Sequence, residues 1–172
     1  MSLSAGSEFP KGVKFAYVPF QEEQQGVLAC GIPIPYDTDK KFAGKKVVIV
    51  AVPGAFTPTC TANHIPPFIS KLAEFKAKGV DQVIVLSAND PFVQSAWGKA
   101  LGVKNNDIIF ASDGNAAFSK SIGQTLDLTD KGLGIRTSRY AIIVDDGKVV
   151  YNEQEPGADV SVSGADAVLA KL

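Results

Sequence analysis

The clearest feature of the hydrophobic pattern is an apolar run over residues 46–52, built almost entirely of valine, isoleucine and alanine. Such a run is typical of a strand that is buried on both faces of an α/β sheet. Pro53 and Gly54 end the strand in a tight turn. Thr57 and Pro58 then indicate the start of a helix, with threonine as N-cap and proline at the first helical position, where its missing N–H costs nothing. The pattern predicts a strand, a turn and a helix in immediate succession.

The rest of the chain alternates short apolar strands with segments of helical spacing. The expected elements are N-terminal edge strands or a hairpin at 13–18 and 27–32, a helix interrupted at 66–67 and ending at 79, a strand at 81–87, a helix from 91 to 101, a strand at 108–110, a helix at 116–122, a hairpin of 140–144 and 149–151, and a helix from about 163. This order predicts a thioredoxin-like α/β sandwich, with a central mixed sheet, helices on both faces and an N-terminal hairpin.

Composition and charge narrow the function classes. The chain has 172 residues, is 45% hydrophobic and carries a net charge of −1, so we expect one domain over residues 1–172 with a full core. A near-neutral charge provides no electrostatic basis for binding nucleic acid. We expect no membrane span, because no apolar run is long enough, and no secretory signal, so the protein should be soluble and intracellular.

The nucleophile and metal-ligand inventory is small. Cys30 and Cys60 are the two cysteines, and His64 is the single histidine. These three residues do not make a tetrahedral zinc site, and no Cys-x-x-Cys pair is present. Gly132-x-Gly134 lacks the third glycine of a dinucleotide loop. We therefore expect neither a metal nor a cofactor. Trp97 has helical spacing with apolar neighbours and is expected in the core rather than at a ligand.

Cys60 has the most suggestive position, because it falls at the third residue of the predicted helix. Unpaired amides and the positive end of the helix dipole favour an anion there, and a thiolate is such an anion and a nucleophile. The alternative is a small buried core residue. His64 is spaced i, i+4 from Cys60 and could form a Cys-His pair, but Pro66 and Pro67 disturb the helix just after it, which favours a local polar neighbour.

The spacing Pro53-x-x-x-Thr57-x-x-Cys60 resembles the active-site signature of peroxiredoxins, and the longer string Pro-Gly-Ala-Phe-Thr-Pro-Thr-Cys resembles the type II, peroxiredoxin-five-like branch. The sequence as a whole resembles fungal alkyl hydroperoxide reductases and the peroxisomal peroxiredoxins of yeasts. The further matching segments are Asn89–Phe92, Ala96–Trp97, Phe118–Lys120 and Ser138–Ala141. The resemblance implies a thiol-dependent peroxidase that reduces hydrogen peroxide and organic hydroperoxides.

The resemblance also implies roles for individual residues. Cys60 would be the peroxidatic cysteine, whose thiolate attacks the hydroperoxide and becomes a sulfenic acid. Thr57 would orient the peroxide, and Pro53 would shield the pocket from water. Arg139 would donate hydrogen bonds to the thiolate and to the peroxide oxygen. Arg136 is a nearby competitor for that role, and either arginine could instead be an ordinary surface residue.

Cys30 leaves more than one reading open. It could be a structural thiol in an N-terminal strand. The resemblance to fungal members implies instead a resolving cysteine that forms an intersubunit disulfide with Cys60 of a homodimer, reduced by thioredoxin. A bridge needs Cα atoms within about 7 Å, so the N-terminal segment must move or come from the partner. Rival readings are a one-cysteine cycle with glutathione or glutaredoxin, a redox relay to a partner protein, and a non-enzymatic interaction module.

The C-terminal residues Ala170-Lys171-Leu172 resemble the peroxisomal Ser-Lys-Leu address, with a small residue in the first position. A helix that happens to end this way is the alternative. The expected location is the peroxisome, with the cytoplasm as the second choice.

Overall fold

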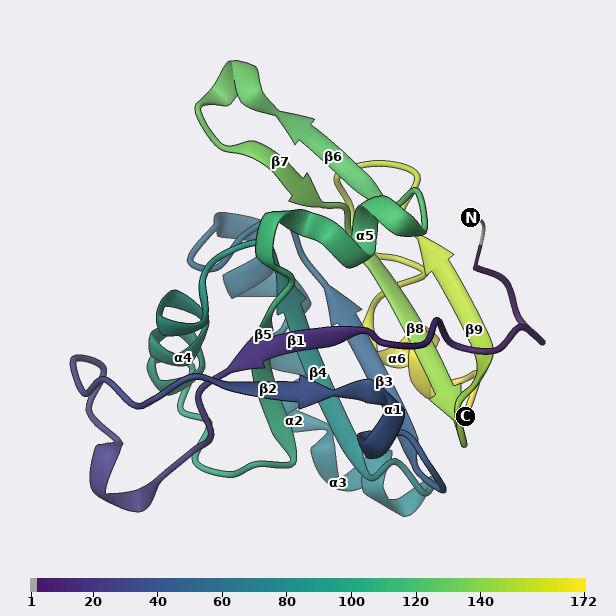
Figure 1. Cartoon of the computed structure of the whole chain (residues 1–172), viewed down its shortest axis with the longest axis horizontal. Helices are drawn as coiled ribbons and strands as arrows, with labels where there is room; N and C mark the ends of the chain where they lie inside the picture. The colour runs from purple at the N-terminus through teal and green to yellow at the C-terminus, as the bar shows by residue number, and fades with distance from the viewer. Residues whose placement is uncertain (1–2) are drawn as a thin grey trace.

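A mixed seven-stranded sheet forms the centre of the computed structural model, which describes residues 3–172 (Figure 1). Its strand order is β2-β1-β5-β4-β3-β8-β9. The strands β3, β4 and β5 run parallel, and the remaining neighbours pair antiparallel. The strands of this sheet are β1 (Lys14–Tyr17), β2 (Ile34–Asp37), β3 (Lys46–Ala51), β4 (Gln82–Ser87), β5 (Ile108–Ser112), β8 (Tyr140–Asp145) and β9 (Lys148–Gln154).

Short helices cover both faces of the sheet, and a separate two-stranded ribbon of β6 (Thr125–Leu128) and β7 (Gly134–Thr137) extends from one end of it (Figure 1). The α-helices of the described residues are α1 (Thr38–Lys41), α2 (Pro66–Ser70), α3 (Leu72–Ala77), α4 (Pro91–Ala100), α5 (Ala117–Ser121) and α6 (Ala165–Leu169). The predicted central mixed sheet with helices on both faces is confirmed.

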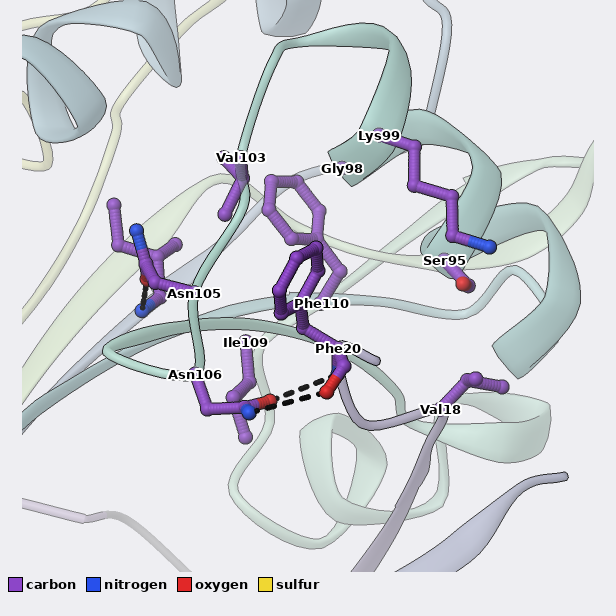
Figure 2. A pocket seen from close by; sticks show the side chains of 11 residues that line it. Val18, Phe20, Ser95, Gly98, Lys99, Val103, Asn105, Asn106, Ile109 and Phe110 are labelled. Atoms are coloured by element: carbon purple, nitrogen blue, oxygen red, sulfur yellow. Dashed lines mark hydrogen bonds between the residues drawn. The ribbon is translucent and has the colours of Figure 1, made fainter. Parts of the chain in front are cut away.

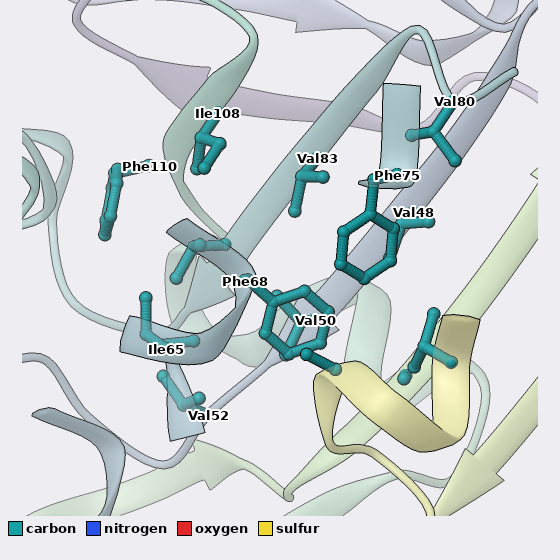
Figure 3. Packing of buried hydrophobic residues seen from close by; sticks show 14 of the residues in the cluster. Val48, Val50, Val52, Ile65, Phe68, Phe75, Val80, Val83, Ile108 and Phe110 are labelled. Atoms are coloured by element: carbon teal, nitrogen blue, oxygen red, sulfur yellow. The ribbon is translucent and has the colours of Figure 1, made fainter. Parts of the chain in front are cut away.

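The two cores meet at β3, as its unbroken apolar run predicts. Val48, Val50 and Val52 belong to one buried cluster, which they form with residues of α2, α3, α4 and α6 (Figure 3). The alternate residues of β3 belong to a second cluster on the opposite face, which includes side chains of α5 and the N-terminal strands. Successive side chains of a strand point to opposite faces, so apolar residues at every position bury both.

The N-terminal hairpin exists, but one of its strands was placed wrongly. β1 falls within the predicted 13–18 segment, whereas its partner is β2 and not residues 27–32. Tyr36 on β2 is almost fully buried opposite Phe15, while Leu28 and Ile32 are 93% and 81% exposed. The apolar run at 27–32 is therefore an exposed irregular segment. Burial of Tyr36 sets the register of this pair, which the local pattern does not reveal.

The helix after β3 also differs from the expectation. Pro58 is its first helical residue, as predicted, but the chain then widens into a π-helical turn over Cys60–His64, where the Ile65 N–H donates to the Cys60 carbonyl at 3.1 Å. The predicted interruption lies at Ile65, one residue earlier than expected, and Pro66 and Pro67 begin α2. Proline is well tolerated in the first turn, where its nitrogen needs no partner.

The start of α4 agrees with its sequence signal. The Asp90 carboxylate accepts hydrogen bonds from the N–H groups of Phe92 and Val93 at 2.9 and 3.0 Å, with proline at the first helical position. Trp97 on this helix is fully buried, as expected. A cavity of about 30 Å³ lies where α4 meets the end of β1, and Gly98, Phe110 and Phe20 are among the residues that line it (Figure 2).

The N-terminal segment that carries Cys30 is attached at this junction. The Phe20 N–H donates to the Asn106 side chain at 2.8 Å, and the Asn106 amide donates back to the Phe20 carbonyl at 3.3 Å (Figure 2). Lys99 of α4 donates to the Ala29 carbonyl at 2.7 Å. These three hydrogen bonds hold the segment against the molecule, together with Phe20 in the cavity wall.

Gly98→Ala should destabilise the fold, because a Cβ at this position would lie 2.6 Å from a ring atom of Phe110. That ring cannot easily yield, since it packs edge-on against Trp97 at 5.6 Å. The overpacking cost of about 1–3 kcal/mol should exceed the helix-propensity gain of up to about 1 kcal/mol. Urea unfolding measures the difference. Gly114→Ala is the control, since nothing lies within 4 Å of its Cβ position. Equal stability of the two variants would contradict the packing argument.

Candidate active site

Cys60 lies just beyond the carboxyl end of β3, where the turn after the strand leads into a helix. Its side chain is almost fully buried, at 1% exposure, and it begins the π-helical turn. Phe56 within the turn has a left-handed φ of 59°, which is costly for a bulky residue. The chain therefore bends sharply here and brings the thiol under the end of the sheet.

Thr57 precedes the first helical residue, as the cap signal predicts. Its hydroxyl, however, donates to the Gly54 carbonyl at 2.7 Å and closes the turn after β3. The Ala55 N–H in the same turn donates to the Asn89 side chain at 2.9 Å, which ties the turn to the end of β4. These bonds place the Thr57 side chain beside the thiol with its oxygen still able to accept a hydrogen bond.

Arg139 reaches Cys60 because of the pairing between β3 and β8. Tyr140 pairs with Ala51, so Arg139, one residue earlier, lies level with the end of β3. Its Nη1 is 3.4 Å from the Cys60 Sγ, and the side chain is buried. Arg136 instead donates from Nε to the Leu133 carbonyl at 2.7 Å. The structure thus brings Arg139, and not Arg136, to the thiol.

The buried guanidinium has no carboxylate partner among the ion pairs of residues 3–172. A buried cation is costly unless a charge or a strong hydrogen-bond acceptor compensates it. The two acceptors next to Arg139 are the Cys60 sulfur and the His64 Nδ1, which is 2.9 Å from Nη1. The Cys60 sulfur and the His64 ring therefore supply the hydrogen-bond acceptors that the buried guanidinium needs.

His64 is fully buried, and its ring nitrogens are both engaged. Nδ1 faces Arg139, and Nε2 lies 2.9 Å from the Ser163 carbonyl. The pKa of His64 is lowered to about 4, chiefly by burial and also by the nearby Arg139 charge, while the bond to Ser163 and the charge of Glu155 oppose the change. The imidazole is therefore neutral at physiological pH. Sequence reasoning treated His64 as a local polar neighbour, although its i, i+4 spacing from Cys60 was a usable signal.

Glu155, at the end of β9, anchors the far side of this cluster. Its carboxylate accepts from the backbone and the hydroxyl of both Ser161 and Ser163, at 2.5–2.7 Å. Burial alone would raise the pKa of Glu155, but these bonds outweigh it and lower the pKa to about 2. Neither Glu155 nor Ser163 was found from the sequence, since they lie far from Cys60 along the chain and carry no motif.

A cavity of about 700 Å³ lies beside Cys60 and Arg139. Cys60, Thr57, Pro53 and Arg139 all contribute to its wall. Much of the remaining wall is apolar and comes from the β6–β7 ribbon, which the hydrophobic pattern did not predict. The apolar residues that this ribbon contributes to the wall are Leu126 and Leu128 of β6 and Leu133 of the turn before β7. The four residues singled out by the motif therefore share one pocket.

Cys30 does not belong to this pocket. It is exposed, its sulfur lies 3.7 Å from the Leu28 carbonyl, and both cysteines are free. No residue of the segment 20–33 is part of the cavity wall. The expectation of a Cys30 strand is wrong, since the segment is irregular.

The described part of the chain lacks two further features, a cluster of metal-ligating side chains and a membrane-spanning helix. Residues 3–172 contain no group of three or more His, Cys, Asp and Glu side chains placed to hold a metal ion. Within the same residues, no helix combines the length and the hydropathy that crossing a bilayer requires.

Comparisons with known proteins match this arrangement. The family model Redoxin matches residues 4–169. A Lipomyces kononenkoae protein named "Putative peroxisomal peroxiredoxin" is 61% identical over 165 residues, covering 96% of this chain and 98% of that protein. Peroxiredoxin Pen c 3 of Penicillium citrinum is 52% identical over 173 residues, with 100% of both chains covered. Crystalline reduced Prx3 in complex with H2O2 from Vibrio vulnificus has a TM-score of 0.84 at 37% identity, with 98% of both chains covered. These likenesses confirm the expected thioredoxin-like fold.

The buried neutral imidazole should make stability depend on pH. An unfolded histidine titrates near 6.5 and folded His64 near 4, so the unfolded chain takes up the proton first as the pH falls. The contribution of neutral His64 to the free energy of unfolding is fully present above pH 6.5. It declines as the pH falls towards 4, by about 3 kcal/mol in total. Urea unfolding between pH 7 and 4.5 measures the slope.

His64→Asn is the matched control, because His64 is the single histidine of the chain and asparagine does not titrate. Between pH 6.5 and 4.5, the free energy of unfolding of the variant should fall less steeply with falling pH than that of the wild-type protein, because the His64 contribution is gone. Loss of stability linked to Glu155 falls in a separate window, between pH 4.5 and 2. Identical slopes in the two proteins would show that folded His64 takes up its proton normally.

Proposed function

The chain belongs to the Redoxin family and is a peroxiredoxin, a thiol-dependent peroxidase, and we propose that Cys60 is its peroxidatic cysteine and Cys30 its resolving cysteine. The observation that carries the first assignment is the contact of a buried Arg139 with the Cys60 sulfur at 3.4 Å. A guanidinium without a carboxylate partner stabilises an adjacent thiolate, and the thiolate is the nucleophile.

In the first step, the Cys60 thiolate attacks the terminal oxygen of a hydroperoxide. The S–O bond forms while the O–O bond breaks, and the leaving alkoxide or hydroxide takes up a proton to become an alcohol or water. Arg139 donates hydrogen bonds to the oxygen on which charge develops, so its contribution is larger in the transition state than in the ground state. Cys60 is left as a sulfenic acid.

Thr57 and Pro53 shape the site for this step. The Thr57 hydroxyl donates to Gly54, so it retains lone pairs that can accept the hydroperoxide proton and orient the terminal oxygen towards sulfur. Pro53 adds an apolar surface with no N–H to the same wall. The leucine-lined part of the cavity provides room for the organic group of a larger hydroperoxide, so both hydrogen peroxide and organic hydroperoxides are proposed substrates.

In the second step, Cys30 of a partner subunit resolves the sulfenic acid. Its thiolate attacks the Cys60 sulfur, an S–S bond forms, the S–O bond breaks, and hydroxide leaves as water after taking up a proton. Within one chain, the segment around Cys30 does not reach the pocket. Its flanking side chains Leu28 and Ile32 are highly exposed and match the apolar wall of the pocket, which supports docking into the partner of a homodimer.

The third step needs a dithiol reductant, for which we propose thioredoxin. One thiolate of the reductant attacks the intersubunit disulfide, which forms a mixed disulfide and releases one protein cysteine. The second thiol of the reductant then attacks the mixed disulfide, so that the other protein cysteine leaves and the reductant departs as its own disulfide. The exposed position of Cys30 leaves its sulfur accessible to such a reductant. Glutathione with glutaredoxin is the alternative that applies if Cys30 takes no part.

The two-cysteine cycle predicts a reducible dimer. After one equivalent of hydrogen peroxide, the wild-type protein should form a dimer band on a non-reducing gel, and both Cys30→Ser and Cys60→Ser should abolish it. Peroxide consumption with thioredoxin should be lost in both variants. Cys60→Ser should also lose the single turnover, whereas Cys30→Ser should retain it, because the first step needs Cys60 alone.

A wild-type band that stays monomeric while Cys60 oxidises would contradict the role of Cys30. Turnover of Cys30→Ser with glutathione would then support a one-cysteine cycle. Mixed disulfides trapped with another protein would instead support a redox relay. A Cys60→Ser protein that still consumes peroxide would overturn the assignment of the peroxidatic cysteine.

We propose the peroxisome as the location, supported by the name of the Lipomyces relative and by the terminal Ala170-Lys171-Leu172. Lys171 is exposed, and the Leu172 N–H donates to the Leu169 carbonyl at 3.3 Å, so the last residues continue the end of α6. A fluorescent protein fused to the N-terminus should accumulate in peroxisomes of a yeast cell. Deletion of the last three residues should release it to the cytoplasm. Equal distribution of both fusions would contradict the proposal.

A further inference from the structure

We propose that His64 is a positioning residue that holds the Arg139 guanidinium against the Cys60 sulfur, and that Ser163 and Glu155 hold His64 in the tautomer this requires. The inference deepens the proposed function, since it rests on Cys60 as the reacting thiol. It concerns a buried imidazole that the reaction steps above leave without a task.

The tautomer of His64 follows from its two partners. Arginine can only donate hydrogen bonds, so the Nδ1 atom that lies 2.9 Å from the Arg139 Nη1 must be the acceptor. The proton of the neutral ring is therefore on Nε2, which donates to the Ser163 carbonyl at 2.9 Å. A backbone carbonyl can only accept, so both ends of the ring specify the same tautomer.

Ser163 is held in turn by Glu155. The Ser163 N–H and hydroxyl both donate to one oxygen of the Glu155 carboxylate, each at 2.7 Å. The Glu155 N–H donates to the Arg139 carbonyl at 2.8 Å. The hydrogen bonds thus form a closed ring, from the Arg139 side chain through His64, Ser163 and Glu155 back to the Arg139 backbone. Each member limits the movement of the next.

The position of the imidazole decides where the guanidinium can point. Nη1 of Arg139 carries two N–H groups, and its two neighbours at hydrogen-bond distance are the imidazole and the sulfur. With one N–H fixed on Nδ1, the other is directed to the Cys60 Sγ. The other nitrogens of the guanidinium remain available to the oxygens of a bound peroxide. Without the imidazole, a long side chain would sample several rotamers, at a cost in transition-state stabilisation.

A protonated imidazole would remove this support, because His64 would then present a donor and a positive charge to Arg139. The groups that face His64 are Arg139, Cys60, Ser163, Glu155 and the Phe68 ring, whose centroid is 6.0 Å away. Burial among them keeps the pKa of His64 at about 4, so the acceptor is present throughout the physiological range.

Two variants of equal size separate the acceptor from the packing. His64→Asn places an amide oxygen near the Nδ1 position, and His64→Leu fills the same space without an acceptor. Both are made in a Cys30→Ser background, so that Cys60 is the single thiol. We measure the rate of alkylation by iodoacetamide from pH 4.5 to 9, the second-order rate constant of the single turnover with hydrogen peroxide, and the circular dichroism of each protein.

His64→Leu should lower the single-turnover rate constant by about ten- to a hundredfold, the range expected from the loss of one hydrogen bond to a charged group. The pH midpoint of its alkylation should rise, because an unfixed guanidinium stabilises the thiolate less. His64→Asn should retain most of both properties. Folded Leu and Asn variants with the same alkylation profile and the same single-turnover rate constant would overturn the proposal.

Glu155→Gln decides the matter if His64→Leu does not fold. It keeps the size of the side chain, whose hydrogen bonds go to Ser161 and Ser163 and not to the sulfur, yet it weakens the bonds that hold Ser163. The alkylation rate at pH 7 should fall by about three- to tenfold, and an unchanged rate would overturn the proposal. Alkylation requires no peroxide, so this result is independent of the proposed function. The peroxidase cycle is tested separately by Cys60→Ser.

Discussion

A buried positive charge without a carboxylate partner is the constraint on which the site depends. The Arg139 guanidinium lies beneath the end of the sheet, where removing it from water is costly. Its neighbours are a sulfur and a neutral imidazole, and neither compensates the charge unless the sulfur is ionised. In the proposed function, the cost of burying the arginine is offset when the adjacent sulfur is an anion, which is the nucleophilic form of a thiol. A carboxylate in the same place would have neutralised Arg139 and removed this bias.

The fold satisfies this constraint by bringing together segments that are distant in the chain. The pairing of β3 with β8 places Arg139 level with the turn that carries Cys60. The π-helical turn then carries His64 under the guanidinium, and the end of β9 supplies Glu155 behind it. The leucine-lined ribbon forms the opposite wall of the cavity. Elements of the central fold therefore hold the Cys60 thiol, while hydrogen bonds of Asn106 and Lys99 connect the exposed segment with Cys30 to the rest of the molecule.

Local signals in the sequence were reliable where one short-range interaction dominates. The apolar run of β3 and the Asp90 cap both correspond to observed elements, because burial of a strand and a cap hydrogen bond are decided within a few residues. The strand predicted at 27–32 is wrong, because the apolar side chains of this segment are exposed. The register of the N-terminal pair follows the buried Tyr36 of β2 instead. The β6–β7 ribbon was missed because its residues are half exposed and its pairing depends on a turn at Gly132 and Gly134, both with positive φ.

The sequence by itself determined the central strand, the turn and the helix start that present Cys60, and the motif that relates the chain to the peroxiredoxins. These features are local, because the interactions that form them involve residues close together in the sequence. The resemblance favoured Arg139 over Arg136, but the contact of Arg139 with the thiol depends on the tertiary structure, because the pairing of β3 with β8 places it there. The tertiary structure also decided that His64 faces Arg139 and that Ser163 and Glu155 stand behind it. Hydrogen bonds across 75 and 99 residues of chain depend on the packing of whole elements, which no local pattern encodes.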